Sequence, residues 1–513
     1  MAPSNVRRVA TLGLISYALS GFALGDYVSE TLTQSGNYNP EFRLSPDYDY
    51  CNARTPTVEE YDKPMVDATL KLVQVVTRHG DRVPKNFLPG HREHWDCKFP
   101  QKVTYMENHP RSNSGAEEQG RLTSTNLEKS IALQEVMYTP KDSPYPVNFW
   151  GSCKPGQLTK KGMEQMLSLG ENLRQIYVDK LGFLPQELKP GVTSAASIAD
   201  NTSPYHYNPG LPIFIRSLNG ERVQSSSQFL LTGLYPSNTR DPDMVVKEVV
   251  YTEEVESMDS HNIDCPKFKP TLQKLKDNTA WKTKNAQTKP LRERVNRVLK
   301  LTDDPRFQDM FTKHRDILMT QKCHGIPFPC DGEDCITEED VRQIMTQATW
   351  EILYLRRDSN HTLYTRLAVG IFLGELAQRW DIHGFTQENT VKDTFNIDGD
   401  SERETKPNPS SPSVSSEPIF EIYSTRGSTM LFIAGLLKQK DVQWPSYASQ
   451  LIFEFWDRNG ETFVRVLHDG KPVQSDLCDF NVCPLEKFRN IMADYITYDR
   501  SECLEDTVAT SNE

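Results

Sequence analysis

The chain has 513 residues, of which 37% are hydrophobic and 10% aromatic, a composition typical of a soluble globular protein and unlike a disordered or membrane-spanning one. Acidic residues outnumber basic ones by 70 to 58, which gives a net charge of −12. This balance disfavours nucleic acid and anionic membranes as partners, because binding to a phosphate backbone depends on basic surface.

The first 25 residues have the pattern of a signal peptide. Arg7 and Arg8 form a positive n-region, an apolar run follows, and small residues precede a cleavage site before Asp26. The alternative is an uncleaved signal anchor, although a run of about 17 residues is short for a membrane span. Both interpretations deliver the remaining chain to the secretory lumen. We therefore expect a secreted or lumenal protein, with no stable membrane insertion unless the anchor is retained.

Ten cysteines in an exported chain predict disulfides rather than metal ligands. Cys478 and Cys483 are close enough for a local bridge, and Cys51 could staple a polar N-terminal arm at residues 26–68. The pairing of the others, including a cluster of Cys323, Cys330 and Cys335, stays open.

Two further local patterns concern modification and metal. Asn201 and Asn360 begin acceptor sequons and are predicted to be glycosylated. The spacing of His91, His94 and Cys97 could suggest zinc, but a tetrahedral site needs a fourth ligand and the compartment favours oxidised cysteine. We interpret this stretch as a loop at the rim of a substrate site, and we predict neither a metal nor a cofactor.

An apolar run at residues 70–76 predicts a buried strand, and the motif that follows ends it abruptly. Residues 77–84 read Thr-Arg-His-Gly-Asp-Arg-Val-Pro. A neutral His79 could act as a nucleophile, and the guanidinium groups of Arg78 and Arg82 match the oxygens of a phosphate. The alternative is a solvated basic turn, but its position at the end of a buried strand favours chemistry.

Strands and helices alternate after this motif. Helical periodicity begins at Thr159, a short buried strand at 212–215 ends at Arg216, and a helix is expected at 221–234. Alternation of this kind predicts the α/β class, a layered sheet with ligands at the carboxyl ends of its strands.

The second half of the chain divides into a helical and a mixed part. A helical cap insertion is predicted at 261–397 and a flexible Ser/Pro-rich loop at 398–417, while residues 69–260 and 418–500 would form the core. The expected elements are helices at 272–277, 291–301, 338–355, 362–380 and 428–437, a strand at 419–423, and a hairpin at 451–467 that turns at Asn459-Gly460.

Several of these stretches together resemble the histidine acid phosphatases, a branch of the histidine phosphatase superfamily. Residues 78–84 resemble their Arg-His-Gly-x-Arg-x-Pro signature, and residues 156–165 resemble their Gly-Gln-Leu-Thr helix start. Similar segments of the family occur at 215–236, 447–472 and 483–485. The resemblance implies a phosphoglycerate mutase-like fold, a phosphohistidine formed on His79, and phosphate binding by Arg78, Arg82 and Arg216.

One block departs from the family. Residues 423–430 read Tyr-Ser-Thr-Arg-Gly-Ser-Thr-Met, where the family has Tyr-Ser-Ala-His-Asp-Thr-Thr-Leu. Arg426 therefore replaces a histidine that contacts phosphate, and Gly427 replaces the aspartate that protonates the leaving group. We predict that Arg426 adds a cation to the phosphate site. Asp81 and Glu421 are weak candidates for a substitute acid, and we interpret Arg222 as structural.

Two functional hypotheses follow. The first is a secreted acid phosphatase whose substrate is a small phosphomonoester and whose proton donor is altered. The second is a weak or inactive relative that binds a phosphorylated sugar or glycan. Short segments at Tyr50-Cys51-Asn52 and Trp95-Asp96-Cys97 resemble the 2-phosphoxylose phosphatase-like subgroup, whose members act on phosphorylated sugars in the secretory pathway. The intact His79 and arginines favour the enzyme.

Overall fold

The structure is a computed structural model, and it describes residues 44–45, 47–86, 88, 95–97, 153–189, 210–241, 244, 246–258, 265–357, 361–385 and 417–504. The predicted signal peptide, the two glycosylation sequons at Asn201 and Asn360, and all but the last residue of the Ser/Pro-rich loop lie outside these ranges.

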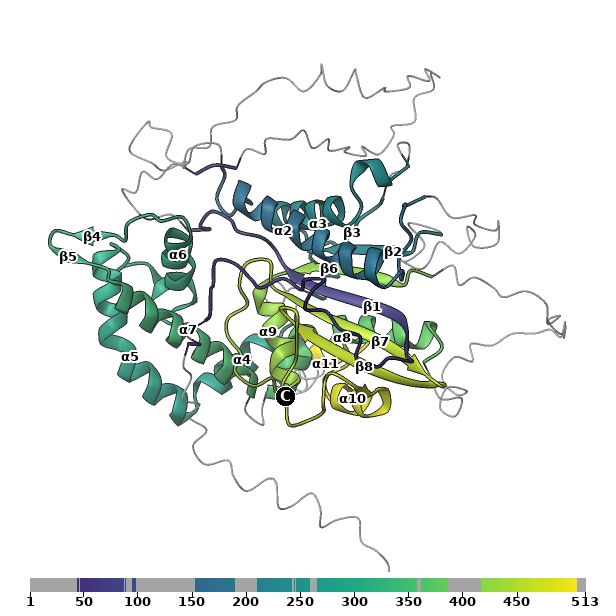
Figure 1. Ribbon diagram of the computed structural model, residues 1–513. Helices are drawn as coiled ribbons and strands as arrows, with labels where there is room; N and C mark the ends of the chain where they lie inside the picture. Colours follow the sequence, from purple (N-terminus) through teal and green to yellow (C-terminus); the bar gives the residue numbers. More distant parts are fainter. Residues whose placement is uncertain are drawn as a thin grey trace, which may run out of the picture. The chain divides into compact units, whose positions relative to one another are not determined.

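A mixed sheet forms the centre of the described part of the chain (Figure 1). Eight strands there follow the order β10-β8-β7-β1-β6-β2-β3, with β9 beside β8. Strand β6 is parallel to both β1 and β2. On the other side of β1, β7 is antiparallel to β1 and β8 is antiparallel to β7. The predicted α/β class is confirmed. The strands are β1 (Thr69–Arg78), β2 (Ile213–Ser217), β3 (Val249–Val250), β6 (Phe420–Thr425), β7 (Gln450–Arg458), β8 (Glu461–His468), β9 (Lys471–Pro472) and β10 (Cys483–Pro484).

Strand β1 lies in the middle of this sheet because both of its faces are apolar. Leu72 and Val76 pack on one face, Val73 and Val75 pack on the other, and all four are fully buried. A strand covered on both sides shows a continuous apolar run rather than an alternating one. The hairpin between β7 and β8 turns at Asn459-Gly460 as predicted, since both residues have the positive φ that this turn requires.

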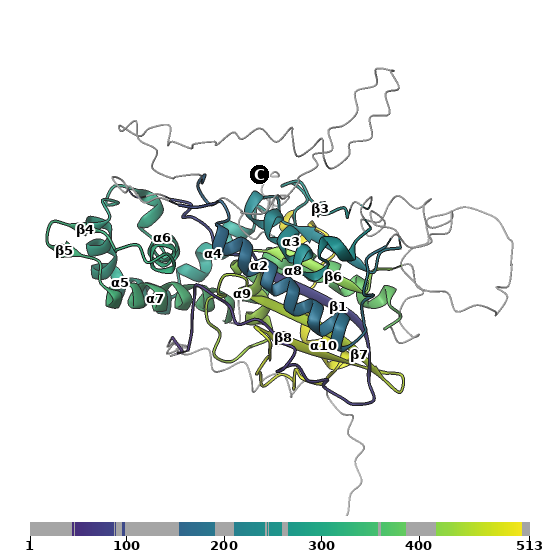
Figure 2. The same ribbon diagram turned by 45° about the horizontal axis from the view of Figure 1, so that its top comes forward.

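Helices cover both faces of the sheet (Figures 1 and 2). Helices α2 and α3 pack against the face of Val73 and Val75, and helices α8, α9 and α10 pack against the face of Leu72 and Val76. Helix α2 begins where predicted, with the Thr159 hydroxyl accepting a hydrogen bond from the backbone N–H of Gly162 at 3.1 Å. The bounds are α2 (Lys160–Arg174, continued by a π-helical stretch at Gln175–Lys180), α3 (Glu221–Leu234), α8 (His361–Ile382), α9 (Gly427–Leu436), α10 (Leu485–Ala493) and α11 (Ser501–Leu504).

The remaining helices lie between α3 and α8 in the sequence, and α5 to α7 share a hydrophobic cluster with α9. They are α4 (Phe268–Lys276), α5 (Thr279–Val298), α6 (Thr312–Cys323) and α7 (Glu338–Arg357), with a short hairpin of β4 (Cys330–Asp331) and β5 (Asp334–Cys335). Short 3-10 turns occur at Ser237–Thr239 and Pro305–Phe307. Helix α6 was not predicted. Its buried residues include His314, Arg315 and Asp316, so the apolar period that reveals a helix is interrupted.

All ten cysteines form disulfides. The predicted bridge between Cys478 and Cys483 is present, and Cys51 ties the N-terminal arm to the end of α6. Cys97 is bonded to another cysteine, so it offers no thiolate to the zinc site considered from its spacing. None of the described helices is both long and apolar enough to cross a membrane. The five pairs are Cys51–Cys323, Cys97–Cys153, Cys265–Cys503, Cys330–Cys335 and Cys478–Cys483.

Candidate active site

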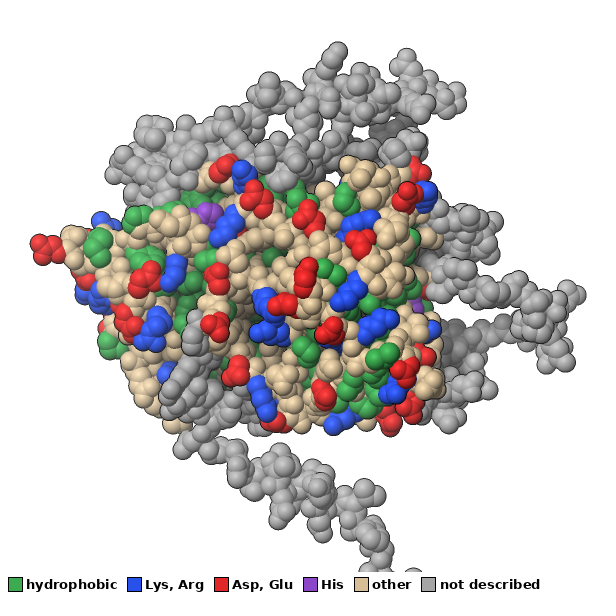
Figure 3. Space-filling view, in the orientation of Figure 1, with side chains coloured by type: hydrophobic (Ala, Val, Ile, Leu, Met, Phe, Trp, Pro, Cys, Tyr) green, Lys and Arg blue, Asp and Glu red, His purple; other side chains and the backbone are tan. Residues whose placement is uncertain are grey.

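A cavity of about 550 Å³ opens where β1 and β6 end, and it brings together residues from distant parts of the chain. Its basic side chains outnumber the single carboxylate among the described lining residues by seven to one. The basic residues are Arg78, Arg82, Lys85, Arg222, Lys313, Arg315 and Arg426, and the carboxylate is Asp316. On the face shown in Figure 3, acidic and basic side chains are intermixed, whereas the described lining of the cavity is predominantly basic.

His79 follows the last residue of β1 and lines this cavity, with only 3% of its surface exposed. Its ring Nδ1 lies 2.8 Å from the carbonyl oxygen of Gly80. Because a carbonyl can only accept, Nδ1 carries the proton and Nε2 keeps its lone pair. Burial and the neighbouring Arg222, Arg78 and Arg82 hold the pKa of His79 well below its usual value. The residue is therefore a neutral imidazole with the nucleophilic nitrogen available.

Gly80 is required by close packing against the start of α2. A Cβ at Gly80 would lie 2.3 Å from the carbonyl oxygen of Gly162, and a Cβ at Gly162 would lie 2.1 Å from the carbonyl oxygen of Asp81. Both approaches are to backbone atoms, which cannot move aside easily. The glycines of the two sequence motifs therefore face each other, and they fix the loop that carries His79.

The two arginines of the motif are buried and held by polar contacts. Arg78 donates to the backbone oxygen of Pro445 and to the hydroxyl of Tyr50, and it lies over the Tyr447 ring at 4.2 Å. Arg82 is paired with Asp316 of α6. Burial raises the pKa of Asp316, but Arg82 and Arg315 outweigh this and lower it to about 2. Asp316 is thus a permanent anion that positions Arg82.

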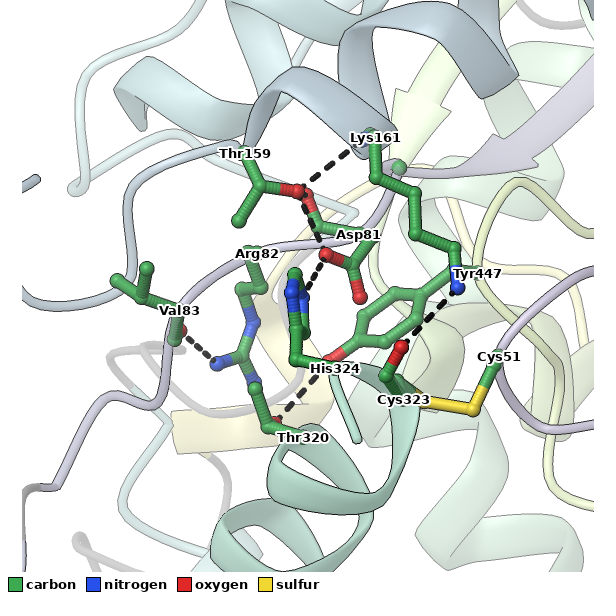
Figure 4. A network of polar contacts seen from close by, with 12 residues as sticks. Cys51, Asp81, Arg82, Val83, Thr159, Lys161, Thr320, Cys323, His324 and Tyr447 are labelled. Carbon is green, nitrogen blue, oxygen red and sulfur yellow. Dashed lines mark hydrogen bonds and ion pairs between the residues drawn. A yellow bond between two sulfur atoms is a disulfide. The ribbon is translucent and has the colours of Figure 1, made fainter. Parts of the chain in front are cut away.

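Asp81 lies between these arginines in sequence, but it is not among the described lining residues, and its side chain points toward Thr159 and His324 (Figure 4). Its Oδ2 accepts from the Thr159 hydroxyl at 2.6 Å and lies 2.5 Å from Nε2 of His324, the residue that follows α6. The same view shows the Cys51–Cys323 disulfide and the backbone oxygen of Cys323, which accepts from Lys161. Asp81 therefore joins the catalytic loop, α2 and the end of α6.

The end of β6 supplies the second side of the cavity. Arg426 lies at the N-cap position of α9 and lines the cavity, as does Gly427. A Cβ at Gly427 would lie 3.2 Å from Nε1 of Trp444 and 3.3 Å from Cδ of Arg78. A side chain at position 427 would therefore be in tight contact with Trp444 and Arg78. The other candidate acid, Glu421, is paired with Arg379 inside the protein and is absent from the described lining.

The structure places two arginines differently from what their predicted roles suggested. Arg216, expected to bind phosphate, is held by a buried network and does not belong to the described lining of the cavity. Its donors reach the carboxylates of Glu256 and Glu375 and the hydroxyl of Ser257. Arg222, interpreted as structural, lies in the first turn of α3 and lines the cavity with His79.

The lining residues that were not anticipated as parts of the site include Lys85, Lys313, Arg315 and Trp444. Lys85 directly follows the motif and was the easiest to find from the sequence. Arg315 stacks on Trp444, with its guanidinium carbon 3.3 Å from the ring centre, and no local sequence pattern connects these two residues. Within the described ranges, no group of three or more histidine, cysteine, aspartate or glutamate side chains could hold a metal ion.

The fold places a cavity rich in basic side chains at the carboxyl ends of two parallel strands, an arrangement suited to binding an anion such as a phosphate ester. A family profile described as histidine phosphatase superfamily (branch 2) matches residues 69–380, so the chain belongs to this superfamily. It is a phosphoric monoester hydrolase by membership of that family, and relatives named as phosphatases match over most of its length.

Three relatives and one solved structure show the range of similarity. Counting factor 60 of Dictyostelium discoideum is 26% identical and covers 86% of this chain and 88% of its own length. Lysophosphatidic acid phosphatase type 6 of Bos taurus is 27% identical, with 83% of each chain covered. The human 2-phosphoxylose phosphatase 1 is 23% identical over 81% of this chain and 75% of its own. The apo phytase of Hafnia alvei has a TM-score of 0.48 and 13% identity, covering 84% of this chain and 98% of that one.

Proposed function

We propose that the protein is a secretory-pathway phosphatase that cleaves small phosphomonoesters through a phosphohistidine on His79. The observation that carries this proposal is a neutral imidazole with a free Nε2 in a cavity lined by guanidinium groups. Nucleophilic catalysis needs the lone pair, and the arginines would stabilise the charge on the transferring phosphoryl oxygens.

The phosphate would be held by the arginines that line the cavity. Arg78 and Arg82 flank the nucleophile, Arg222 approaches from α3, and Arg426 would take the place of the family's second histidine. Arg216 is not included, because carboxylates already occupy its donors. Each charge-assisted hydrogen bond to the phosphate is expected to contribute roughly 1.5–3 kcal/mol.

The cavity also has an apolar side, which bears on the leaving group. Residues of α4, α7 and α8 line it, and these helices belong to the segment predicted as a cap at 261–397. We propose that this segment selects substrates whose alcohol is partly apolar. Two relatives are named for phosphates of different alcohols, a lysophosphatidic acid and a phosphoxylose, and this lining favours the first kind. The apolar residues are Phe268, Leu272, Met310, Ile352, Leu355 and Tyr364.

Secretion and glycosylation are proposed on separate grounds. Five disulfides fit a protein of the secretory pathway, because such bonds persist in oxidising compartments. The signal peptide at residues 1–25 and glycans on Asn201 and Asn360 are part of the proposal. Mass spectrometry of the exported protein, before and after glycosidase treatment, tests all three.

The missing carboxylate at Gly427 favours a second candidate, a relative that binds a phosphorylated sugar or glycan without turning it over. Hydrolysis of p-nitrophenyl phosphate from acidic to neutral pH separates the two. We expect turnover and an acid-labile phosphoenzyme that are both lost in His79→Ala and kept in His383→Ala, whose ring lies outside the described lining. No turnover above the His79→Ala background, with phosphate still raising the melting temperature, would support the binding protein.

A further inference from the structure

The described lining of the cavity contains no carboxylic acid that can give up a proton near neutral pH. Gly427 has no side chain, and Asp316 is held as an anion by Arg82. Asp81 and Glu421 are committed to contacts elsewhere. An alkyl leaving group nevertheless needs a proton, because an alkoxide is a very poor leaving group.

Lys85 lines the same cavity as His79 and comes directly after the motif's Pro84. It is exposed to solvent through the cavity, and its backbone N–H lies 3.4 Å from Oδ2 of Asp316. Three cations act on its ammonium group, namely Arg82 of the same loop, Arg222 of α3 and Arg426 before α9. The opposing anion is Asp316 of α6. A Cβ built at Gly156 would lie 3.4 Å from Cγ of Lys85 and 3.8 Å from Nη1 of Arg222, so these two lining side chains lie close together.

This environment makes Lys85 an unusual lysine. Partial desolvation, followed by the charges of Arg222, Arg82 and Arg426, lowers the pKa of Lys85 to about 7. A group with such a pKa can both give and accept a proton at neutral pH, as general acid–base catalysis requires. Arginine cannot do this, because it stays protonated at any working pH.

We propose that the ammonium group of Lys85 is the proton donor to the leaving group, in place of the aspartate replaced by Gly427. The inference rests on the proposed phosphohistidine. As Nε2 of His79 bonds to phosphorus, the bond from phosphorus to the leaving oxygen breaks, and that oxygen takes a proton from Lys85. Water then attacks the phosphohistidine and gives a proton to the Lys85 amine. The nitrogen–phosphorus bond breaks, phosphate leaves, and both side chains return to their starting states.

Lys313 is the natural control, because it is a second lysine in the same lining. The charges acting on it are Arg306 and Asp304, in the turn before α6, rather than the arginines around His79. Tyr364 also lines the cavity, and its ring packs against Phe268 and Phe432. Lys85 is the lysine placed among the phosphate-binding residues.

The test compares two leaving groups in Lys85→Met, Lys85→Arg and Lys313→Met. We expect Lys85→Met to lower kcat for an alkyl phosphate by roughly 10²–10³-fold, and for p-nitrophenyl phosphate by less than about tenfold, because nitrophenolate leaves without a proton. Lys85→Arg keeps the charge but should not restore alkyl phosphate hydrolysis. In the unmodified enzyme, kcat/KM for the alkyl phosphate should fall as pH rises through about 7. This fall should be absent from the pH profiles of Lys85→Met and Lys85→Arg.

Three results would overturn the inference. Rescue by Lys85→Arg would assign Lys85 an electrostatic role, and equal losses for both substrates in Lys85→Met would assign it to binding. An effect of Lys313→Met as large as that of Lys85→Met would remove the distinction between the two lysines. If the protein has no His79-dependent activity at all, the proposed function and this inference both fail. If His79 is essential and Lys85 is not, only the inference fails.

Discussion

The ends of β1 and β6 are neighbours in the sheet, and each has an arginine and a glycine at or just beyond its last residue. Arg78 lies opposite Thr425 in the parallel register, so Arg78-His79-Gly80 and Arg426-Gly427 leave the sheet side by side. A Cβ built at Gly80, at the β1 end, would lie 2.3 Å from the backbone oxygen of Gly162. A Cβ built at Gly427, at the β6 end, would lie 3.2 Å from Nε1 of the Trp444 side chain.

This difference explains why one block matches the family and the other departs from it. At the β1 end the packing of two backbones determines the residue, so a change there damages the fold. At the β6 end only side chains are in contact, and side chains can be exchanged together. The structure therefore allows residue 427 to change while the loop that carries His79 stays fixed.

The largest expected effect is on the free energy of unfolding, when glycine is replaced by alanine at the β1 end and, separately, at the β6 end. Gly80→Ala should cost roughly 3 kcal/mol or more in unfolding free energy, because its methyl group meets the backbone of Gly162. Gly427→Ala should cost about 1 kcal/mol or less, since Trp444 can yield by a few tenths of an ångström. Thermal and denaturant unfolding of both variants measure this, and similar losses would contradict the contrast between the two ends.

The next effect separates the two arginines of the α3 region. Arg222→Gln should lower kcat/KM by roughly ten- to a hundredfold at little cost in stability, because it would remove a charged contact to phosphate. Arg216→Gln should instead lower the melting temperature, since it leaves Glu256 and Glu375 buried with one cation fewer. Steady-state kinetics and thermal unfolding of both variants test this difference. A purely kinetic defect in Arg216→Gln would support the predicted role of Arg216 in phosphate binding.

These arginines also show what the sequence could and could not reveal. Strand β1, helices α2 and α3 and the β7–β8 hairpin were predicted because their signals are local, namely periodicity, capping and turn residues. The placement of Arg216 outside the described lining was not visible in the sequence, because it depends on carboxylates 40 and 159 residues away from Arg216. Helix α6 was missed for a related reason, since polar and charged residues interrupt the apolar part of its buried surface and have partners in distant segments.

A smaller effect concerns the anion that positions Arg82. The folded-state pKa of Asp316 is about 2, below the usual 3.8, so the pair stabilises the protein above about pH 4 and loses this contribution as pH falls towards 2. The loss should be on the order of 2 kcal/mol. Unfolding midpoints between pH 5 and 2 should therefore fall less in Asp316→Asn than in the unmodified protein. Asp303→Asn, at an exposed position, should follow the unmodified protein, and parallel curves for all three would contradict the assignment.

The smallest expected change comes from restoring the family's aspartate at Gly427. The carboxylate would enter beside Arg78, but its Cβ already crowds Nε1 of Trp444, so we expect less than about a threefold change in alkyl phosphate hydrolysis. Trp444→Phe removes the atom that obstructs position 427, and the double variant with Gly427→Asp should therefore exceed either single variant, by up to roughly tenfold. Steady-state kinetics with an alkyl phosphate measure the coupling. A gain of two orders of magnitude from Gly427→Asp alone would mean that the β6 end lacks only the carboxylate, and that Trp444 has not closed the position.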